Sequence, residues 1–176
     1  KGFTQKVVFR KEVFHEEYIY KTLAFYDDSY VVDVEIDMVE ISNNVYRNSE
    51  FSWGGGLSST EENIDDDVYY FNSYALQGGE LESLKVGSGD SEEVTLNGIT
   101  DWAAIRTKYF AVAIIPENKR SISSVALSGA GDTTETYGMS FIFDPMEKQV
   151  FKLYMGPREY DRVRSLGVSL ESIMDF

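Results

Sequence analysis

The alternation of apolar and acidic residues at positions 32–38 constrains the fold of this chain more than any other feature. Four apolar residues alternate there with three acids: Val32, Val34, Ile36 and Met38 with Asp33, Glu35 and Asp37. A period of two is typical of a β-strand with one buried face and one solvated face. Residues 17–25 form a second β-like run, and Asp27-Asp28-Ser29 between the two is a natural turn. The two strands are therefore predicted to form a hairpin.

Further β-like runs follow, separated by clusters of Gly, Asn, Asp or Ser, at residues 68–74, 81–86, 93–96, 109–115, 121–127, 139–143 and 150–155. Many short strands at this spacing indicate an antiparallel sandwich and not a βαβ fold. Residues 43–67 interrupt the pattern and are predicted to be a long loop or insertion. Trp53 in this stretch is expected to plug the edge of the sandwich, with stacking on a sugar or a partner as the alternative.

The end of the chain changes character and is predicted to be helical. Pro157 suits a first helical position, Gly167 suits a position just past a helix end, and one stripe carries Tyr160, Val163 and Leu166. A second short helix is expected to be capped by the Ser169 side chain and to carry Leu170, Ile173, Met174 and Phe176. The predicted organisation is a β body over residues 1–155 followed by a C-terminal helical segment over 156–176.

Charge and composition exclude several classes of protein. Thirty acids oppose 16 bases among 176 residues, for a net charge of −14, and nucleic acid and anionic lipid repel such a surface. Residues 27–101 hold most of the excess, and the two ends are near neutral. No cysteine is present, which excludes disulfides and thiolate metal sites. No apolar run is long enough to span a membrane, and the chain, which opens without Met or a signal-peptide pattern, is expected to be a piece of something longer.

No catalytic constellation is evident. His15 is the one histidine, which excludes histidine-based zinc sites and leaves a Ser-His-Asp triad without a Gly-x-Ser-x-Gly elbow. A glycosidase-type pair of carboxylates stays open, because any two of the thirty acids could meet. The acids at 61–67 could gather around calcium, although they lack an EF-hand pattern and a solvated loop is the favoured interpretation. No catalytic, metal-binding or cofactor-binding residue is therefore assigned.

Two segments carry a more specific pattern. Residues 102–116 join a Trp-x-Ala block to Tyr-Phe-x-x-Ala-x-Ile-Pro, and residues 153–160 contain Tyr-x-Gly-Pro. Together they resemble the large periplasmic domain of the YidC membrane protein insertase family, and residues 25–45 resemble that family's strand pair around an Asp-x-Tyr turn. The motif residues, expected to be packing residues, are Trp102, Tyr109, Phe110, Pro116, Gly156 and Pro157.

The resemblance implies an all-β fold, an antiparallel β-supersandwich with one or two short C-terminal α-helices. It implies a periplasmic loop of a polytopic inner-membrane protein, without enzymatic activity or cofactor, that serves as scaffold and interaction surface. The implied partners are SecDF and other Sec translocon components, the insertase's own transmembrane region and a substrate peptide, with the membrane reached only through segments outside this chain. Contacts with a partner are predicted at Tyr160, Arg162 and Arg164.

A carbohydrate- or peptide-binding β-sandwich module is the alternative. Its support is the 12 Tyr, 11 Phe and 2 Trp of the chain, because aromatic faces in sandwiches often bind sugars. This alternative predicts an open cleft lined by several exposed aromatic rings.

Overall fold

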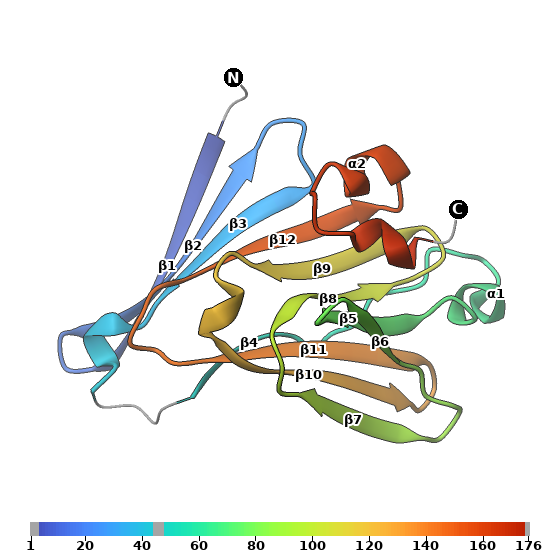
Figure 1. Ribbon diagram of the computed structural model, residues 1–176, viewed down its shortest axis with the longest axis horizontal. Helices are drawn as coiled ribbons and strands as arrows, with labels where there is room; N and C mark the ends of the chain where they lie inside the picture. Colours follow the sequence, from blue (N-terminus) through green and yellow to red (C-terminus); the bar gives the residue numbers. More distant parts are fainter. Residues whose placement is uncertain (1–3, 44–47, 175–176) are drawn as a thin grey trace.

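The computed structural model describes residues 4–43 and 48–174 and folds them into two antiparallel sheets packed face to face (Figure 1). In order across the large sheet, its eight described strands are β1 (Thr4–Phe14), β2 (Glu17–Tyr26), β3 (Val31–Asp37), β12 (Gln149–Pro157), β9 (Phe110–Pro116), β8 (Thr100–Arg106), β5 (Asn72–Gln77) and β6 (Glu80–Leu84). The small sheet has the order β4 (Ser49–Trp53), β11 (Glu135–Phe143), β10 (Ile122–Gly131) and β7 (Ser91–Leu96). Short helices are η1 (Val39–Ile41), α1 (Ile64–Val68), η2 (Lys119–Ser121), α2 (Tyr160–Arg164) and η3 (Leu170–Ile173). The predicted all-β sandwich is confirmed.

The hairpin predicted from the period-two pattern is β2–β3. The two strands are antiparallel with Leu23 opposite Val34, and the turn between them contains Asp28 in the left-handed region at φ 54°. Val32 and Val34 are buried between the two sheets, whereas Asp33 on the other face forms an ion pair with Lys152. The apolar residues of the alternating pattern thus face the core between the sheets, and the acids face the outer side of the large sheet.

The central strands of the large sheet are covered on both faces. Along β8, Ala103 and Ile105 face the small sheet, whereas Trp102 and Ala104 face the C-terminal segment. A strand covered on both faces reads as a continuous apolar run, and for this reason residues 111–116 show no alternation. Aromatic rings fill part of the core between the sheets. The ring centroids of Phe151 and Phe141 lie 5.7 Å apart.

Two predictions for the middle of the chain are wrong. Residues 43–67 are not one long loop, because they contain β4 and α1, although 44–47 lie outside the described residues. That they form an insertion stays a prediction. β4 escaped prediction because only Phe51 and Trp53 mark its inner face. The predicted strand at 68–74 is also displaced: Val68 ends α1, whose N-terminus is capped by the Asn63 side chain, and the strand begins at Asn72.

The C-terminal segment is helical, but its predicted start is wrong. Pro157 is the last residue of β12 and pairs with Phe110, so α2 begins only at Tyr160. Gly167, with φ 71°, lies two residues past Ser165, the C-cap of α2. Ser169 has φ 61° and makes no capping bond with its side chain, which contradicts the predicted cap. Phe176 lies outside the described residues.

None of the helices in residues 4–43 and 48–174 is long and apolar enough to cross a bilayer.

Candidate functional site

The C-terminal segment forms a bracket, defined here as residues 158–174, which pack on the outer face of the large sheet. Figure 1 shows α2 and η3 on the side of this sheet that faces away from the small sheet. The bracket buries Val163, Leu170, Ile173 and Met174 against the sheet residues Trp102, Ala104, Ala111, Ala113, Ile115 and Tyr154. The alanines leave a shallow floor on which the helical turns can lie close to the strands.

Side chains of the sheet bind main-chain carbonyl groups of the bracket. The indole N–H of Trp102 donates a hydrogen bond of 2.7 Å to the carbonyl oxygen of Val168. The buried guanidinium of Arg106 donates through Nη1 to the carbonyl oxygen of Ile173. Ile173 is the last residue of η3, where carbonyl groups lack partners within the helix, and Arg106 supplies one. Val168 lies between α2 and η3, and Trp102 supplies a donor for its carbonyl group. The C-terminal segment is therefore held by polar contacts as well as by apolar packing.

Gly156 lies at the point where β12 enters the bracket. A Cβ at this position would lie 2.7 Å from Cγ of Tyr30, a distance that side chains do not tolerate. The Tyr30 ring also packs edge-on against the ring of Tyr154, with centroids 6.4 Å apart. The Tyr-x-Gly-Pro motif and the Asp-x-Tyr turn are distant in sequence but pack against each other, through Tyr154 and Gly156 on one side and Tyr30 on the other.

Tyr154 is buried and donates its hydroxyl proton to the carbonyl oxygen of Pro157. Burial disfavours the phenolate and raises the pKa of Tyr154 to about 12. The residue is a neutral structural donor and not a proton-transfer group near neutral pH.

The six motif residues do not share one environment. Trp102, Pro116 and Gly156 are buried, and Pro157 is half-buried. Tyr109 and Phe110 expose 48% and 41% of their surface, so neither ring lies in the core, and their structural role stays a prediction. Tyr109 lies in the β8–β9 turn, and Phe110 is the first residue of β9.

The three predicted partner-contact residues lie on the exposed face of α2, so Tyr160 does not share the buried position of Val163. Arg162 donates through Nε to Oε2 of Glu159 at 2.7 Å, and this bond raises the pKa of Arg162. Its guanidinium also lies 5.0 Å from the centroid of the Tyr30 ring. The guanidinium of Arg164 lies 5.7 Å from the centroid of the Tyr160 ring. Contact with a partner stays a prediction.

A cleft of about 680 Å³ opens beside the bracket, between the two sheets. Its walls include the rings of Tyr30, Trp53 and Phe110, with the Glu159 carboxylate among its lining groups. Trp53 packs against the inter-sheet core, and its indole N–H donates to the carbonyl oxygen of Gly56 at 2.8 Å. Trp53 therefore closes an edge of the sandwich and also forms a wall of an open cleft.

The acidic stretch contributes one buried carboxylate. Asp67 accepts hydrogen bonds from the Ser59 hydroxyl at 2.7 Å and from the main-chain N–H of Lys108 at 2.9 Å, which ties α1 to the β8–β9 turn. Within residues 4–43 and 48–174, no three His, Asp or Glu side chains are grouped as metal ligands would be. His15 lies exposed in the β1–β2 turn.

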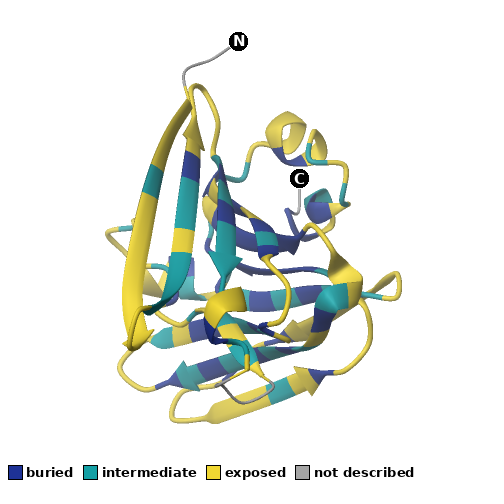
Figure 2. Ribbon diagram, turned by 90° about the vertical axis from the view of Figure 1, so that its left-hand side faces the viewer, coloured by how far each residue is buried: buried dark blue, intermediate teal, exposed yellow. Residues whose placement is uncertain are grey.

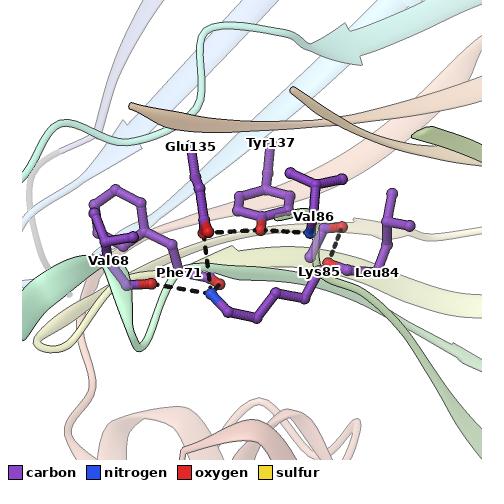
Figure 3. Close-up of polar contacts among 8 residues, drawn as sticks. Val68, Phe71, Leu84, Lys85, Val86, Glu135 and Tyr137 are labelled. Carbon is purple, nitrogen blue, oxygen red and sulfur yellow. Dashed lines mark hydrogen bonds and ion pairs between the residues drawn. The ribbon is translucent and has the colours of Figure 1, made fainter. Parts of the chain in front are cut away.

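A second polar cluster, shown in Figure 3, joins the two sheets. The Lys85 ammonium donates to the carbonyl oxygens of Val68 and Phe71 at 3.0 and 2.7 Å and forms an ion pair with Glu135 at 3.0 Å. The Tyr137 hydroxyl donates to the same carboxylate at 3.0 Å and accepts from the main-chain N–H of Val86. Burial raises the pKa of Tyr137 to about 12. All of these bonds are structural.

Sequence reasoning missed Arg106, Asp67, Lys85 and Tyr154 as polar anchors. Arg106 alone carried a signal, since it is a cation at the end of a strand that is otherwise apolar. Nothing in the sequence separates Asp67 from its two acidic neighbours.

The sequence matches the family described as the YidC periplasmic domain over residues 3–176. The chain belongs to this YidC family. Proteins named membrane protein insertase YidC are relatives: that of Prosthecochloris aestuarii is 35% identical over 97% of this chain and 30% of its own length. That of Chlorobaculum parvum is 35% identical over 88% of this chain and 28% of its own length. The chain thus spans less than a third of these YidC relatives, and it is a periplasmic domain.

A solved alpha-N-acetylgalactosaminidase from Bifidobacterium bifidum has a similar fold. Its TM-score is 0.52 at 14% identity, covering 89% of this YidC domain and 28% of that chain. At this identity the likeness concerns the fold alone.

Proposed function

We propose that this domain is a non-catalytic part of a membrane protein insertase and serves it as scaffold and interaction surface. The relatives that cover nearly all of the chain are named membrane protein insertase. The observation that carries the proposal is the bracket, in which Trp102 and Arg106 bind the main chain of residues that follow the last strand. The bracket fixes the orientation of the β body relative to the transmembrane region of the insertase.

The environments of the polar groups support a non-catalytic role. A catalytic acid or base needs a pKa near the working pH and access to a substrate. Instead, Asp67 is enclosed by donors from the main chain, and Tyr137 and Tyr154 hold their protons to about pH 12. These groups stabilise the fold.

We further propose that the exposed face of α2 meets the partners of the insertase, its own transmembrane region and SecDF or other components of the Sec translocon. Arg164 and Tyr160 project from this face beside the bracket. The test is co-purification of the periplasmic region of SecDF with the wild-type domain and with a Tyr160→Ala, Arg164→Ala variant. The control is a Lys119→Ala variant, which changes η2. If the double variant no longer retains the SecDF region while the wild-type and Lys119→Ala domains do, the contact is supported. Equal retention by all three proteins overturns it.

The scaffold role itself is tested in the full-length insertase. Trp102→Ala and Arg106→Met together release the bracket and should reduce insertion of a reporter membrane protein at unchanged insertase abundance. Unchanged insertion with a demonstrably released bracket would refute the scaffold role.

A second candidate function is favoured by the cleft beside the bracket. Tyr30, Trp53 and Phe110 present rings to an open space of about 680 Å³, as the carbohydrate-binding alternative requires. The test is tryptophan fluorescence during titration with N-acetylgalactosamine and N-acetylglucosamine. A saturable change that disappears in Phe110→Ala but persists in Tyr109→Ala supports sugar binding, and a flat titration to high millimolar concentrations eliminates it.

A further inference from the structure

The large sheet extends beyond the small sheet at the end formed by β1 and β2. Strands β10 and β11 of the small sheet pack over β5 and β8, and β4 reaches β12 through Phe51, whose ring centroid lies 4.8 Å from that of Phe151. Residues directly opposite on paired strands share a face, so Phe9, Lys21 and Ile36 all face the side of the small sheet. Phe9 nevertheless exposes 55% of its surface, and Figure 2 shows β1 exposed along nearly its whole length. Among the strands of residues 4–43 and 48–174, none covers this inner face.

The strand nearest to the uncovered face is β4, and β4 has a free edge. It pairs with β11 from Ser49 to Trp53 and lies at the end of its sheet. Within the described part of the chain, no main-chain hydrogen bond outside this ladder involves residues 49–53. The N–H and C=O groups on the other side of β4 are therefore available to a further strand.

The free edge and the uncovered face enclose a groove of about 610 Å³. Its apolar lining comes from Phe9, Ile19, Ile36, Met38 and Phe51. Neighbouring strands lie about 4.8 Å apart and packed sheets about 10 Å apart. Because β4 packs over β12, a strand added beside β4 would lie over β3, next to the inner face of β2. The groove thus has the shape of one missing strand.

The charge in the groove is opposite to that of the molecule. Lys11 and Lys21 lie on the inner face, and no ion pair joins either lysine to another residue in 4–43 or 48–174. Glu50 is the one acid among the described residues that line the groove. It alternates with the inward-facing Phe51, so its carboxylate belongs to the outer face of β4. In the part of the chain that the structure describes, a protein with a net charge of −14 therefore presents two ammonium groups without an ion-pair partner beside a strand edge without a pairing strand.

We propose that this groove binds an extended peptide of another protein as a fifth strand beside β4. Main-chain hydrogen bonds to β4 hold the peptide. Its inward side chains combine an apolar residue over Phe9 and Ile36 with carboxylates that pair with Lys11 and Lys21. This site is separate from the bracket and from the aromatic cleft, so it is independent of the scaffold role.

The experiment uses the 176-residue chain and a fluorescein-labelled peptide, Thr-Glu-Val-Val-Val-Glu-Thr, followed by fluorescence anisotropy. One face of this peptide carries Glu, Val and Glu. Saturable binding is expected, weakened by added salt. A peptide with Lys in place of both Glu, and peptides N-methylated at alternate amides, should bind about tenfold more weakly or not at all.

Matched variants separate the groove from the rest of the surface. Lys11→Glu and Lys21→Glu should each weaken binding about tenfold. Lys6→Glu is the control, because Lys6 lies on β1 but faces the outer side with Asp33. Amide chemical shifts of residues 49–53 should move on binding. No saturation, indifference to N-methylation, or equal effects of Lys6→Glu and Lys21→Glu would each overturn the proposal, as would a dimer formed through β4 that excludes the peptide.

Discussion

The indole N–H of Trp102 donates to the carbonyl oxygen of Val168 at 2.7 Å, and this contact joins a central strand to a segment 66 residues further along the chain. Trp102 is completely buried beneath the bracket. Its large ring fills the space under the helical turns while its one polar atom satisfies a carbonyl group there. The same residue therefore supplies both the packing and the polar attachment of the C-terminal segment.

Trp102→Phe keeps a ring in place but removes the donor. Because the carbonyl of Val168 is left without its partner, the free energy of unfolding should fall by about 1–3 kcal/mol. Urea denaturation measures it. Trp53→Phe, which removes a local hydrogen bond at a partly buried site, should cost less, and equal losses would count against the special role of Trp102.

Gly156→Ala places a methyl group where the Tyr30 ring now lies. The overpacking should lower the free energy of unfolding by about 1–3 kcal/mol. Gly54→Ala is the control, since nothing lies within 4 Å of its added Cβ, and it should be nearly neutral. Combination of Gly156→Ala with Tyr30→Ala should recover part of the loss in a double-mutant cycle, and strict additivity would contradict the contact.

Lys85→Met removes the ammonium that binds Val68, Phe71 and Glu135 together (Figure 3). Hydrogen bonds to a charged group are strong, so a loss of about 1–3 kcal/mol in the free energy of unfolding is expected. Lys119→Met breaks the exposed ion pair with Asp101 and should cost less than about 1 kcal/mol. Thermal unfolding of both variants measures the two losses of stability. A larger loss in Lys119→Met than in Lys85→Met would refute the structural role given to Lys85.

Alkaline pH should destabilise the fold through Tyr137 and Tyr154. Burial raises the pKa of both from 10.0 to about 12, so the folded state retains protons that the unfolded state loses. Their contribution to stability is complete below pH 10 and declines as the pH rises through about 12. The melting temperature should fall over this range, and less steeply in Tyr154→Phe. An identical slope in this variant would show that Tyr154 does not contribute.

Sequence reasoning succeeded where a local pattern coincides with the final environment. The alternation of Val32, Val34 and Ile36 predicted the β2–β3 hairpin, because each apolar residue meets the core. It failed at Pro157, where pairing of β12 with Phe110 on β9 overrides a local helix-start signal. The edge strand β4 and the exposed strand β1 were missed because few of their residues are buried.

The anchors of the site could not be predicted for a different reason. Asp67 meets the N–H of Lys108 across 41 residues, and Arg106 meets the carbonyl of Ile173 across 67. Such contacts depend on the three-dimensional arrangement of strands, which a single sequence does not specify residue by residue. The family resemblance predicted the fold, but it did not predict which residues form these hydrogen bonds.

Hydrogen exchange of the amides of residues 160–174 tests the bracket most directly, compared between the full-length insertase and its Trp102→Ala, Arg106→Met variant. A fixed bracket predicts slow exchange in the wild-type protein, fast exchange in the variant, unchanged exchange in the strands of the small sheet, and a parallel loss of reporter insertion. Fast exchange in the wild-type protein, or full insertion by a variant whose segment exchanges freely, would contradict a scaffold that acts through this segment.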